Sequence, residues 1–258
     1  MRPALVIACI FLSLAMAVAW AVHRRTGNSG WIDAIWTFAV GLAAVLALSM
    51  MTADGARRVL LSLLVSVWSA RLGLHIVKRT LRSSDDPRYA DLIAQWGPSA
   101  PLRLFVFLQV QALAGMVLVV ATALAAASAA PALSAGTALF SLLALLSVAG
   151  EGVADTQLAQ CKRNRPPDGV CRTGLWARSR QPNYFFEWLY WLSVALIALV
   201  PATSAIAWLA LAAPALMYVI LRHGSGVPHL EAHMQRTRPV AFADYAKTVP
   251  VFFPRLWR

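Results

Sequence analysis

The alternation of apolar and polar positions divides the chain into long apolar runs that short polar stretches separate. Most runs approach the length of about 20 residues that a helix needs to cross a membrane. They occupy residues 3–22, 31–52, 57–78, 103–129, 133–160, 184–200 and 203–222. The first run could also be a secretory signal peptide, but its length favours a retained helix. The pattern therefore predicts an all-α, polytopic integral membrane protein of about seven transmembrane helices.

The polar residues between and after the runs are mainly basic. They form stretches at residues 79–102, 161–183 and 222–258. The connections near Pro131 and Pro201 carry no charge. Because cytoplasmic loops carry an excess of Lys and Arg, we expect the basic stretches in the cytoplasm, the N-terminus outside and the C-terminus inside. Arg57 and Arg58 fall on the outer side in this topology, where we expect them to reach the interface by snorkelling.

Composition supports a membrane location, and a bacterial inner membrane is the expected one. The chain of 258 residues is 59% hydrophobic and 13% charged, whereas soluble domains are about 25% charged. We therefore expect one membrane domain over residues 1–258. The net charge of +12 lies in loops that contact membrane lipids, so we expect no nucleic-acid partner. The tail from Phe252 to Trp257 mixes aromatics and cations, which suits a segment at the membrane interface.

Motifs of several soluble enzyme classes are absent from the sequence. No GxGxxG, GxxxxGK(S/T), GxSxG or HExxH pattern occurs, so Rossmann, P-loop and zinc-protease sites are not supported. The three cysteines, Cys9, Cys161 and Cys171, include no Cys-x-x-Cys pair. We expect neither a metal site nor a disulfide framework. Free thiols fit a reducing cytoplasmic face.

The densest group of polar residues runs from Glu151 to Glu187. Glu151 and Asp155 are four residues apart and share one helix face, which Lys162 extends. Carboxylates at the membrane edge usually face a cavity or a partner. Salt bridges to loop arginines are the alternative interpretation.

A second part of this group lies around Pro182, a residue that begins helices well. Asn183 and Glu187 are four residues apart on one face of the predicted helix. Arg178, Arg180 and the free amides at the helix start could hold phosphate groups. Ordinary loop basicity beside an aromatic belt is the alternative.

Polar residues also interrupt two of the N-terminal runs. Asp33 lies in the second run, and Arg71 and His75 lie four residues apart in the third. A buried Arg71–Asp33 ion pair is one interpretation. The other is that these residues line a polar cavity between the helices.

Residues 174–188, Gly-Leu-Trp-x-Arg-Ser-Arg-x-Pro-Asn-Tyr-x-x-Glu-Trp, resemble the C-terminal signature of the steroid 5-alpha-reductase superfamily. Residues 238–254, Arg-Pro-x-x-Phe-x-x-Tyr-x-x-Thr-x-x-x-Phe-Phe-Pro, match the same signature. Further matches are Asp33-x-x-Trp36, Trp68-x-x-Arg71-Leu and Asp86-x-Arg88-Tyr89. The resemblance covers nearly the whole chain and is closest to a bacterial branch of largely unassigned function.

The resemblance implies an NADPH-dependent oxidoreductase that reduces an activated carbon–carbon double bond. Its substrate would be a steroid-like or other lipid-like enone entering from the bilayer. Residues 31–130 would form the substrate side, and residues 150–258 the cofactor-binding half. The expected cofactor-binding residues are Glu151, Asp155, Lys162, Arg172, Arg178, Arg180, Asn183, Tyr184, Glu187 and Tyr245. Lys162 stands where steroid reductases carry arginine, and Glu151 where they carry asparagine.

The expected catalytic residues are Asp33, Arg71 and His75. Steroid reductases polarise the substrate carbonyl with a glutamate in the second helix and a tyrosine in the third. Asp33 falls near the first position, whereas Trp68 roughly replaces the tyrosine and cannot act as an acid. His75 could substitute, because its pKa suits proton donation. This departure bears on steroid specificity more than on the cofactor.

Two alternatives remain. Membrane methyltransferases of isoprenylcysteine or phospholipid share the Arg-x-Pro-x-Tyr string and bind S-adenosylmethionine at the same place. Their tails commonly carry paired glutamates, where this chain has Glu231 followed by His233. The other alternative is a non-enzymatic membrane or transport protein. The sequence leaves the substrate, the proton donor and the oligomeric state open.

Overall fold

The computed structural model is helical, which confirms the all-α prediction. It describes residues 1–82, 85–129, 131–132, 134–164, 166–201 and 204–255. Over these residues it contains no β-strand. Trp257, part of the predicted interfacial tail, lies outside the described residues. The chain divides into two compact units: Met1–Ser141 with Val194–Ala213, and Leu142–Ser193 with Pro214–Arg258.

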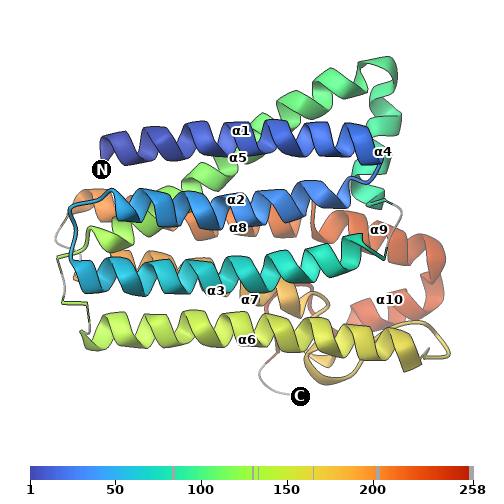
Figure 1. Ribbon diagram of the computed structural model, residues 1–258. Coiled ribbons are helices and arrows are strands. Elements are labelled where there is room, and N and C mark those ends of the chain that lie inside the picture. Colours follow the sequence, from blue (N-terminus) through green and yellow to red (C-terminus); the bar gives the residue numbers. More distant parts are fainter. Residues whose placement is uncertain (83–84, 130, 133, 165, 202–203, 256–258) are drawn as a thin grey trace. The chain divides into compact units, whose positions relative to one another are not determined.

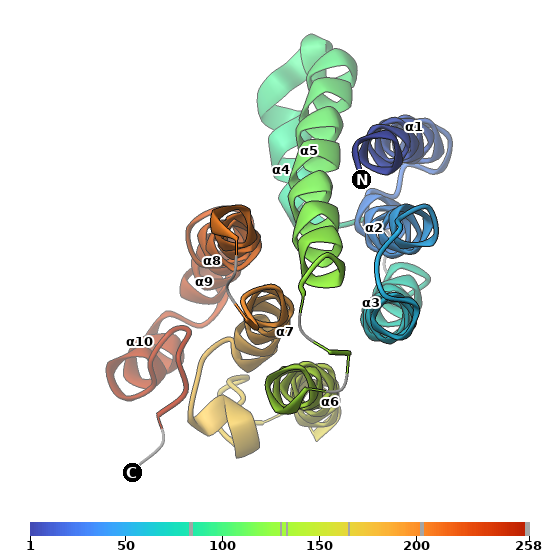
Figure 2. The ribbon, with the colours of Figure 1, turned by 90° about the vertical axis from the view of Figure 1, so that its left-hand side faces the viewer.

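The first unit is built around four long helices. They are α1 (Arg2–Thr26), α2 (Gly30–Ser49), α3 (Gly55–Thr80) and α5 (Ala100–Ala126). α2 lies between α1 and α3, and α5 packs against α1 and α2 (Figure 1, Figure 2). Between α3 and α5 the chain forms α4 (Pro87–Trp96) and the short η1 (Gly97–Ser99), and the unit also includes η3 (Ala205–Leu211).

The helices α2 and α3 approach closely because small residues lie at their contact. A side chain added at Gly41 would collide with Ser69, and one added at Gly73 would collide with Phe38. The Ser69 hydroxyl donates to the main-chain oxygen of Thr37 at 3.1 Å. Small residues and interhelical hydrogen bonds of this kind hold helices together in membranes.

Arg57 is buried in the first unit, so the prediction that it snorkels to the interface is wrong. Its guanidinium donates to the main-chain oxygens of Ala125 and Pro131, both at 3.1 Å, and to the Thr137 hydroxyl at 3.0 Å. The last carbonyls of a helix have no partner within that helix. Buried Arg57 therefore supplies a hydrogen-bond donor to a main-chain oxygen at the end of α5. Arg57 itself lies in the first turn of α3, whose N-cap is Asp54.

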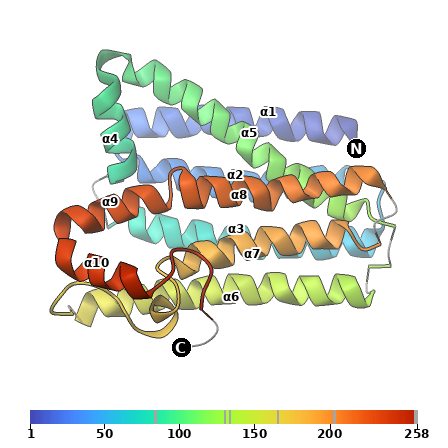
Figure 3. The ribbon, with the colours of Figure 1, turned by 180° about the vertical axis from the view of Figure 1, so that it is seen from behind.

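The second unit contains the C-terminal helices and their loops. Its elements come from α6 (Ala135–Asn164), η2 (Gly174–Ala177), α7 (Pro182–Ala198), α8 (Ala212–His223), α9 (Val227–Thr237) and α10 (Pro239–Thr248). After α8 and α9 the chain turns back along α10 (Figure 3). An apolar cluster of Val170, Phe242, Tyr245 and Val249 packs α10 against the loop after α6.

The described part of the tail folds back within the second unit. The ring of Phe252 lies edge-on to Trp188 and Tyr218, with centroid distances of 6.2 and 5.3 Å. The amide of Arg255 donates to the Arg178 carbonyl at 3.0 Å, and the amide of Arg180 donates to a tail carbonyl. The tail therefore belongs to the unit that holds the predicted cofactor residues.

Six helical segments of the described chain are long and apolar enough to cross a membrane, which supports membrane integration. They are Arg2–Thr26, Gly30–Ser49, Gly55–Thr80, Pro87–Ala126, Ala135–Asn164 and Ala205–Thr237. The sixth predicted run, 184–200, is not among these segments; it corresponds to α7, which has 17 residues. At about 1.5 Å per residue it extends roughly 26 Å, less than the hydrocarbon core of about 30 Å.

Candidate functional site

In the second unit, α6 and α7 bring two of the predicted polar positions together. The Asn183 side-chain amide donates to the Asp155 carboxylate at 3.3 Å. Further along, Gly150 of α6 lies against the ring of Phe186 on α7, where an added side chain would collide. The contacts run in opposite directions along the two helices, so α6 and α7 pack antiparallel here.

Three carboxylates are buried on these facing helices. Glu151, Asp155 and Glu187 are 5, 9 and 4% exposed. Trp191 donates its indole N–H to Glu187 at 3.0 Å. The Asn183 side-chain oxygen is buried and accepts no hydrogen bond from a described residue. The α6–α7 polar face, meaning Glu151, Asp155, Asn183 and Glu187, therefore offers one buried acceptor without a described partner, the side-chain oxygen of Asn183.

Such a face suits a ligand that is rich in donors. Ionised carboxylates only accept hydrogen bonds, and amide N–H groups, hydroxyls and cations can satisfy them. Buried acceptors without partners are unfavourable by about 1–3 kcal/mol each. No group of three Asp, Glu, His or Cys residues is placed to hold a metal ion among the described residues.

Arg180 has partners within the chain, which give it a structural role; its predicted part in cofactor binding stays a prediction. Its side chain is 10% exposed, and its Nε donates to the Glu231 carboxylate at 2.7 Å. Its Nη1 donates to the main-chain oxygens of Ala246 and Val249 at 3.1 and 2.8 Å. Arg180 thus fastens α9 and α10 to the start of α7.

Arg172 and Tyr245 also make internal contacts. Arg172 pairs with Asp168 at 2.8 Å and donates to the main-chain oxygen of Ala241 at 2.9 Å. The Tyr245 hydroxyl donates to the main-chain oxygen of Trp176 at 2.5 Å. Burial raises the pKa of Tyr245 well above its ordinary value. Both predicted cofactor residues therefore hold α10 to the loop between α6 and α7.

The remaining predicted cofactor residues lie nearer to the surface. Lys162, at the end of α6, and Arg178, just after η2, are exposed, and Tyr184 on α7 is half-buried. Of the predicted cations, Lys162, Arg172 and Arg178 are exposed, whereas Arg180 is largely buried.

The first unit contains a second polar group, centred on Asp33 at the start of α2. Arg88 of α4 pairs with Asp33 at 2.5 Å, and the Tyr89 hydroxyl donates to Asp33 at 2.8 Å. The Tyr89 oxygen accepts a hydrogen bond from Gln111 of α5 at 2.9 Å. Among the described contacts, the ion-pair partner of Asp33 is Arg88, and together with Tyr89 these residues form the Asp33–Arg88–Tyr89 group.

A carboxylate and a phenol are the chemically relevant parts of the Asp33–Arg88–Tyr89 group. The side chains of Asp33 and Arg88 are 23 and 22% exposed, so a ligand can reach them. Arg88 also pairs with Asp86 at 2.7 Å. Although burial acts in the opposite direction, the hydrogen bond and charge of Arg88 hold the pKa of Asp86 below its ordinary value. Arg88 is therefore oriented by two carboxylates.

Sequence reasoning missed Arg88, Tyr89 and Gln111 as site residues. The motif Asp86-x-Arg88-Tyr89 was a signal for two of them, but it carried no assigned role. The other two expected catalytic residues, Arg71 and His75, lie half-buried on α3.

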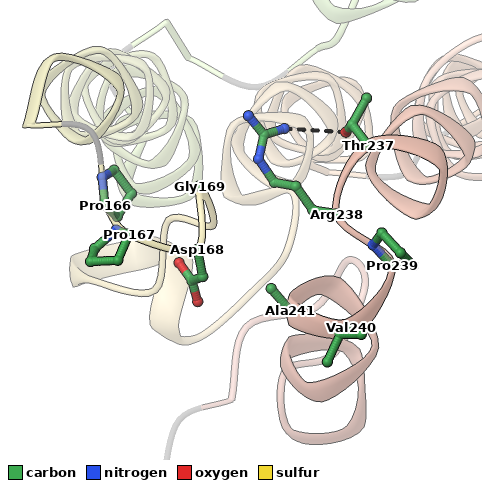
Figure 4. Close-up of a pocket in the computed structure, with 9 residues that line it drawn as sticks. All are labelled: Pro166, Pro167, Asp168, Gly169, Thr237, Arg238, Pro239, Val240 and Ala241. Carbon is green, nitrogen blue, oxygen red and sulfur yellow. Dashed lines mark hydrogen bonds between the residues drawn. The ribbon is translucent and has the colours of Figure 1, made fainter.

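The surface depressions of the second unit lie apart from the α6–α7 polar face. The larger one is a groove of about 530 Å³ between the loop at Pro166–Gly169 and the start of α10. Figure 4 shows the Arg238 side chain in this groove, where its guanidinium donates a hydrogen bond to the Thr237 hydroxyl. A smaller one of about 320 Å³ lies at the end of α6. Neither is lined by Asn183 or Glu187.

Fold and site together define a helical membrane protein with buried ionisable residues in both units. A family model described as a protein of unknown function, DUF1295, matches residues 19–249. The chain belongs to this family. No curated protein and no solved structure matches the chain.

Proposed function

We propose that the protein is an NADPH-dependent membrane reductase of an activated carbon–carbon double bond. The substrate would be a steroid-like or other lipid-like enone. The motif resemblance of residues 174–188 and 238–254 to the steroid 5-alpha-reductase superfamily supports this reaction. The observation that carries the proposal is the α6–α7 polar face, with its buried acceptor on Asn183.

This face fits the nicotinamide half of NADPH. The carboxamide N–H groups would donate to Asn183 and to a nearby carboxylate, and the ribose hydroxyls would donate to Asp155 or Glu187. Lys162 and Arg178 would bind the phosphates. Arg172, Arg180 and Tyr245 would act on the cofactor only indirectly, by holding the loop and tail around the start of α7.

The first unit would act on the substrate carbonyl. Bound NADPH would supply a hydride to the β carbon of the enone. The Tyr89 hydroxyl would turn its proton from Asp33 to the carbonyl oxygen when substrate binds, while Gln111 continues to donate to the Tyr89 oxygen. Donors aimed at a developing enolate oxygen lower the barrier of such reactions. Arg71 and His75 remain candidates for the polar lining around the substrate.

For membrane topology we propose the seven-span arrangement, with the N-terminus outside and the C-terminus in the cytoplasm of a bacterial cell. The length of α7, 17 residues, is at the lower limit of about 17–25 residues for membrane helices. The basic stretches around Lys162 and Arg178 would then face the cytoplasm, where NADPH is available.

One observation favours the methyltransferase as a second candidate. S-adenosylmethionine carries a sulfonium and an ammonium group, and a face with three buried carboxylates also suits a cationic ligand. The internal pairing of Arg180 removes one cation that would oppose such binding. The two candidates differ in the phosphate groups, which NADPH carries and S-adenosylmethionine does not.

The reductase proposal is tested by enone-dependent oxidation of NADPH with the purified protein in detergent. Asn183→Ala should weaken NADPH binding about two- to tenfold, the value of one hydrogen bond. Gln235→Ala, at an exposed position of α9, is the matched control and should leave binding unchanged. Equal NADPH affinity of both variants would contradict the assignment of Asn183.

A further inference from the structure

Two of the three cysteines lie on neighbouring segments of the second unit. Cys161 belongs to the last turns of α6, and Cys171 precedes η2. The segment around η2 contacts α6 at two points. The Trp176 indole donates to the main-chain oxygen of Ala154 at 2.9 Å, and the amide of the residue before Trp176 donates to Gln157 at 2.9 Å.

These contacts bring the two thiols together. Ala154, Gln157 and Cys161 are spaced by three and four residues and therefore share one face of α6. The segment that ends at Trp176 follows this face, and its Thr173 and Gly174 line one depression together with Cys161. Cys171 comes two residues before Thr173, which places it close to the same end of α6. Both cysteines are free.

The two thiols differ in their access to solvent. Cys161 is half-buried and lines the open depression of about 320 Å³, together with Thr173 and Gly174. Cys171 is 8% exposed. A reagent can therefore reach Cys161 first, while Cys171 is held next to it and shielded.

We propose that Cys161 and Cys171 form a reversible dithiol–disulfide pair that reacts with small-molecule disulfides such as oxidised glutathione. This inference is independent of the proposed reductase activity. The Cys161 thiolate attacks one sulfur of oxidised glutathione, the sulfur–sulfur bond breaks, and one glutathione leaves with the proton that Cys161 released.

The second step closes the protein disulfide. Cys171 loses its proton and attacks the Cys161 sulfur, and the second glutathione leaves as a thiol. The protein loses two hydrogen atoms and two electrons, and the reagent gains them. The new bond joins the end of α6 to the segment that contains Arg172, whose guanidinium holds the main-chain oxygen of Ala241. Oxidation would therefore stiffen the connection between α6 and α10.

The test uses the full-length protein in detergent, treated with oxidised glutathione and then with N-ethylmaleimide. Peptide mass spectrometry should find a Cys161–Cys171 linked peptide that dithiothreitol reverses. Cys9, in α1, is the internal control. It should stay a free thiol during the glutathione treatment and should then be alkylated by N-ethylmaleimide. Cys171→Ser should stop at the mixed disulfide on Cys161, about tenfold more abundant than in the wild type.

Mapping of the wild-type protein decides the proposal even if a variant fails to fold. Three results would overturn it: both thiols stay reduced, Cys161 retains glutathione without closing the disulfide, or the oxidised cysteines join different protein molecules. Preferential pairing of Cys161 with Cys9 would also contradict the geometry.

Discussion

Replacement of Arg180 by alanine separates the structural role of this residue from the phosphate-binding role that the sequence predicted. The change removes the ion pair with Glu231 and the hydrogen bonds to the carbonyls of Ala246 and Val249. Because these contacts connect three helices of the second unit, we expect the main effect on the stability of that unit.

The magnitude follows from the burial of the pair. Removing one member of a buried ion pair destabilises a protein by about 3–5 kcal/mol. The side chain of Glu231 is 20% exposed, so water can partly solvate it after Arg180 is lost. We therefore expect the lower end, about 3 kcal/mol, for Arg180→Ala.

Thermal unfolding in detergent and limited proteolysis of the C-terminal region measure this effect. Arg236→Ala removes an exposed arginine of α9 and is the matched control. The Arg180→Ala, Glu231→Gln double-mutant cycle should show coupling between the two residues. If Arg180→Ala unfolds within about 0.5 kcal/mol of Arg236→Ala and mainly weakens NADPH binding, the structural assignment is refuted.

Three further predictions concern the catalytic group, pH and topology. Asp33→Asn and Tyr89→Phe should each lower turnover about tenfold or more with little change in NADPH affinity. If a variant loses turnover and NADPH affinity to the same extent, its residue has a structural role. Because burial raises the pKa of Tyr245 above its ordinary value of 10.0, stability is retained below that pH and declines as pH rises above it. Unfolding of Tyr245→Phe in denaturant should show a smaller decline over the same pH range. In a protein without native cysteines, a thiol reagent outside intact cells should label Pro201→Cys but spare Leu175→Cys; the reverse result would exclude the proposed orientation.

The long helices were predictable because length and apolar content alone define a membrane helix. The predicted run 57–78 corresponds to α3, Gly55–Thr80, and the run 31–52 to α2, Gly30–Ser49. The ends differ by a few residues, since caps such as Asp54 decide them. The reach of α7 was overestimated because apolar residues continue beyond Ala198 after the helix has ended.

The polar contacts were less predictable, because they join positions that are distant along the chain. Asp33 was identified, but its partner on α4 depends on how the loop after α3 folds back. Likewise, no local signal links Arg180 to Glu231. By contrast, the motif resemblance grouped Asp155 with Asn183 across two helices, and the two side chains are in contact.

Equilibrium binding of NADPH and of S-adenosylmethionine to the purified protein tests the central claim most directly. Calorimetry in detergent would compare the two ligands for the wild type and for Asn183→Ala. We expect NADPH to bind more tightly than NADH, S-adenosylmethionine not to compete with it, and Asn183→Ala to weaken it. Tight binding of S-adenosylmethionine without any binding of NADPH would contradict the reductase and favour the methyltransferase.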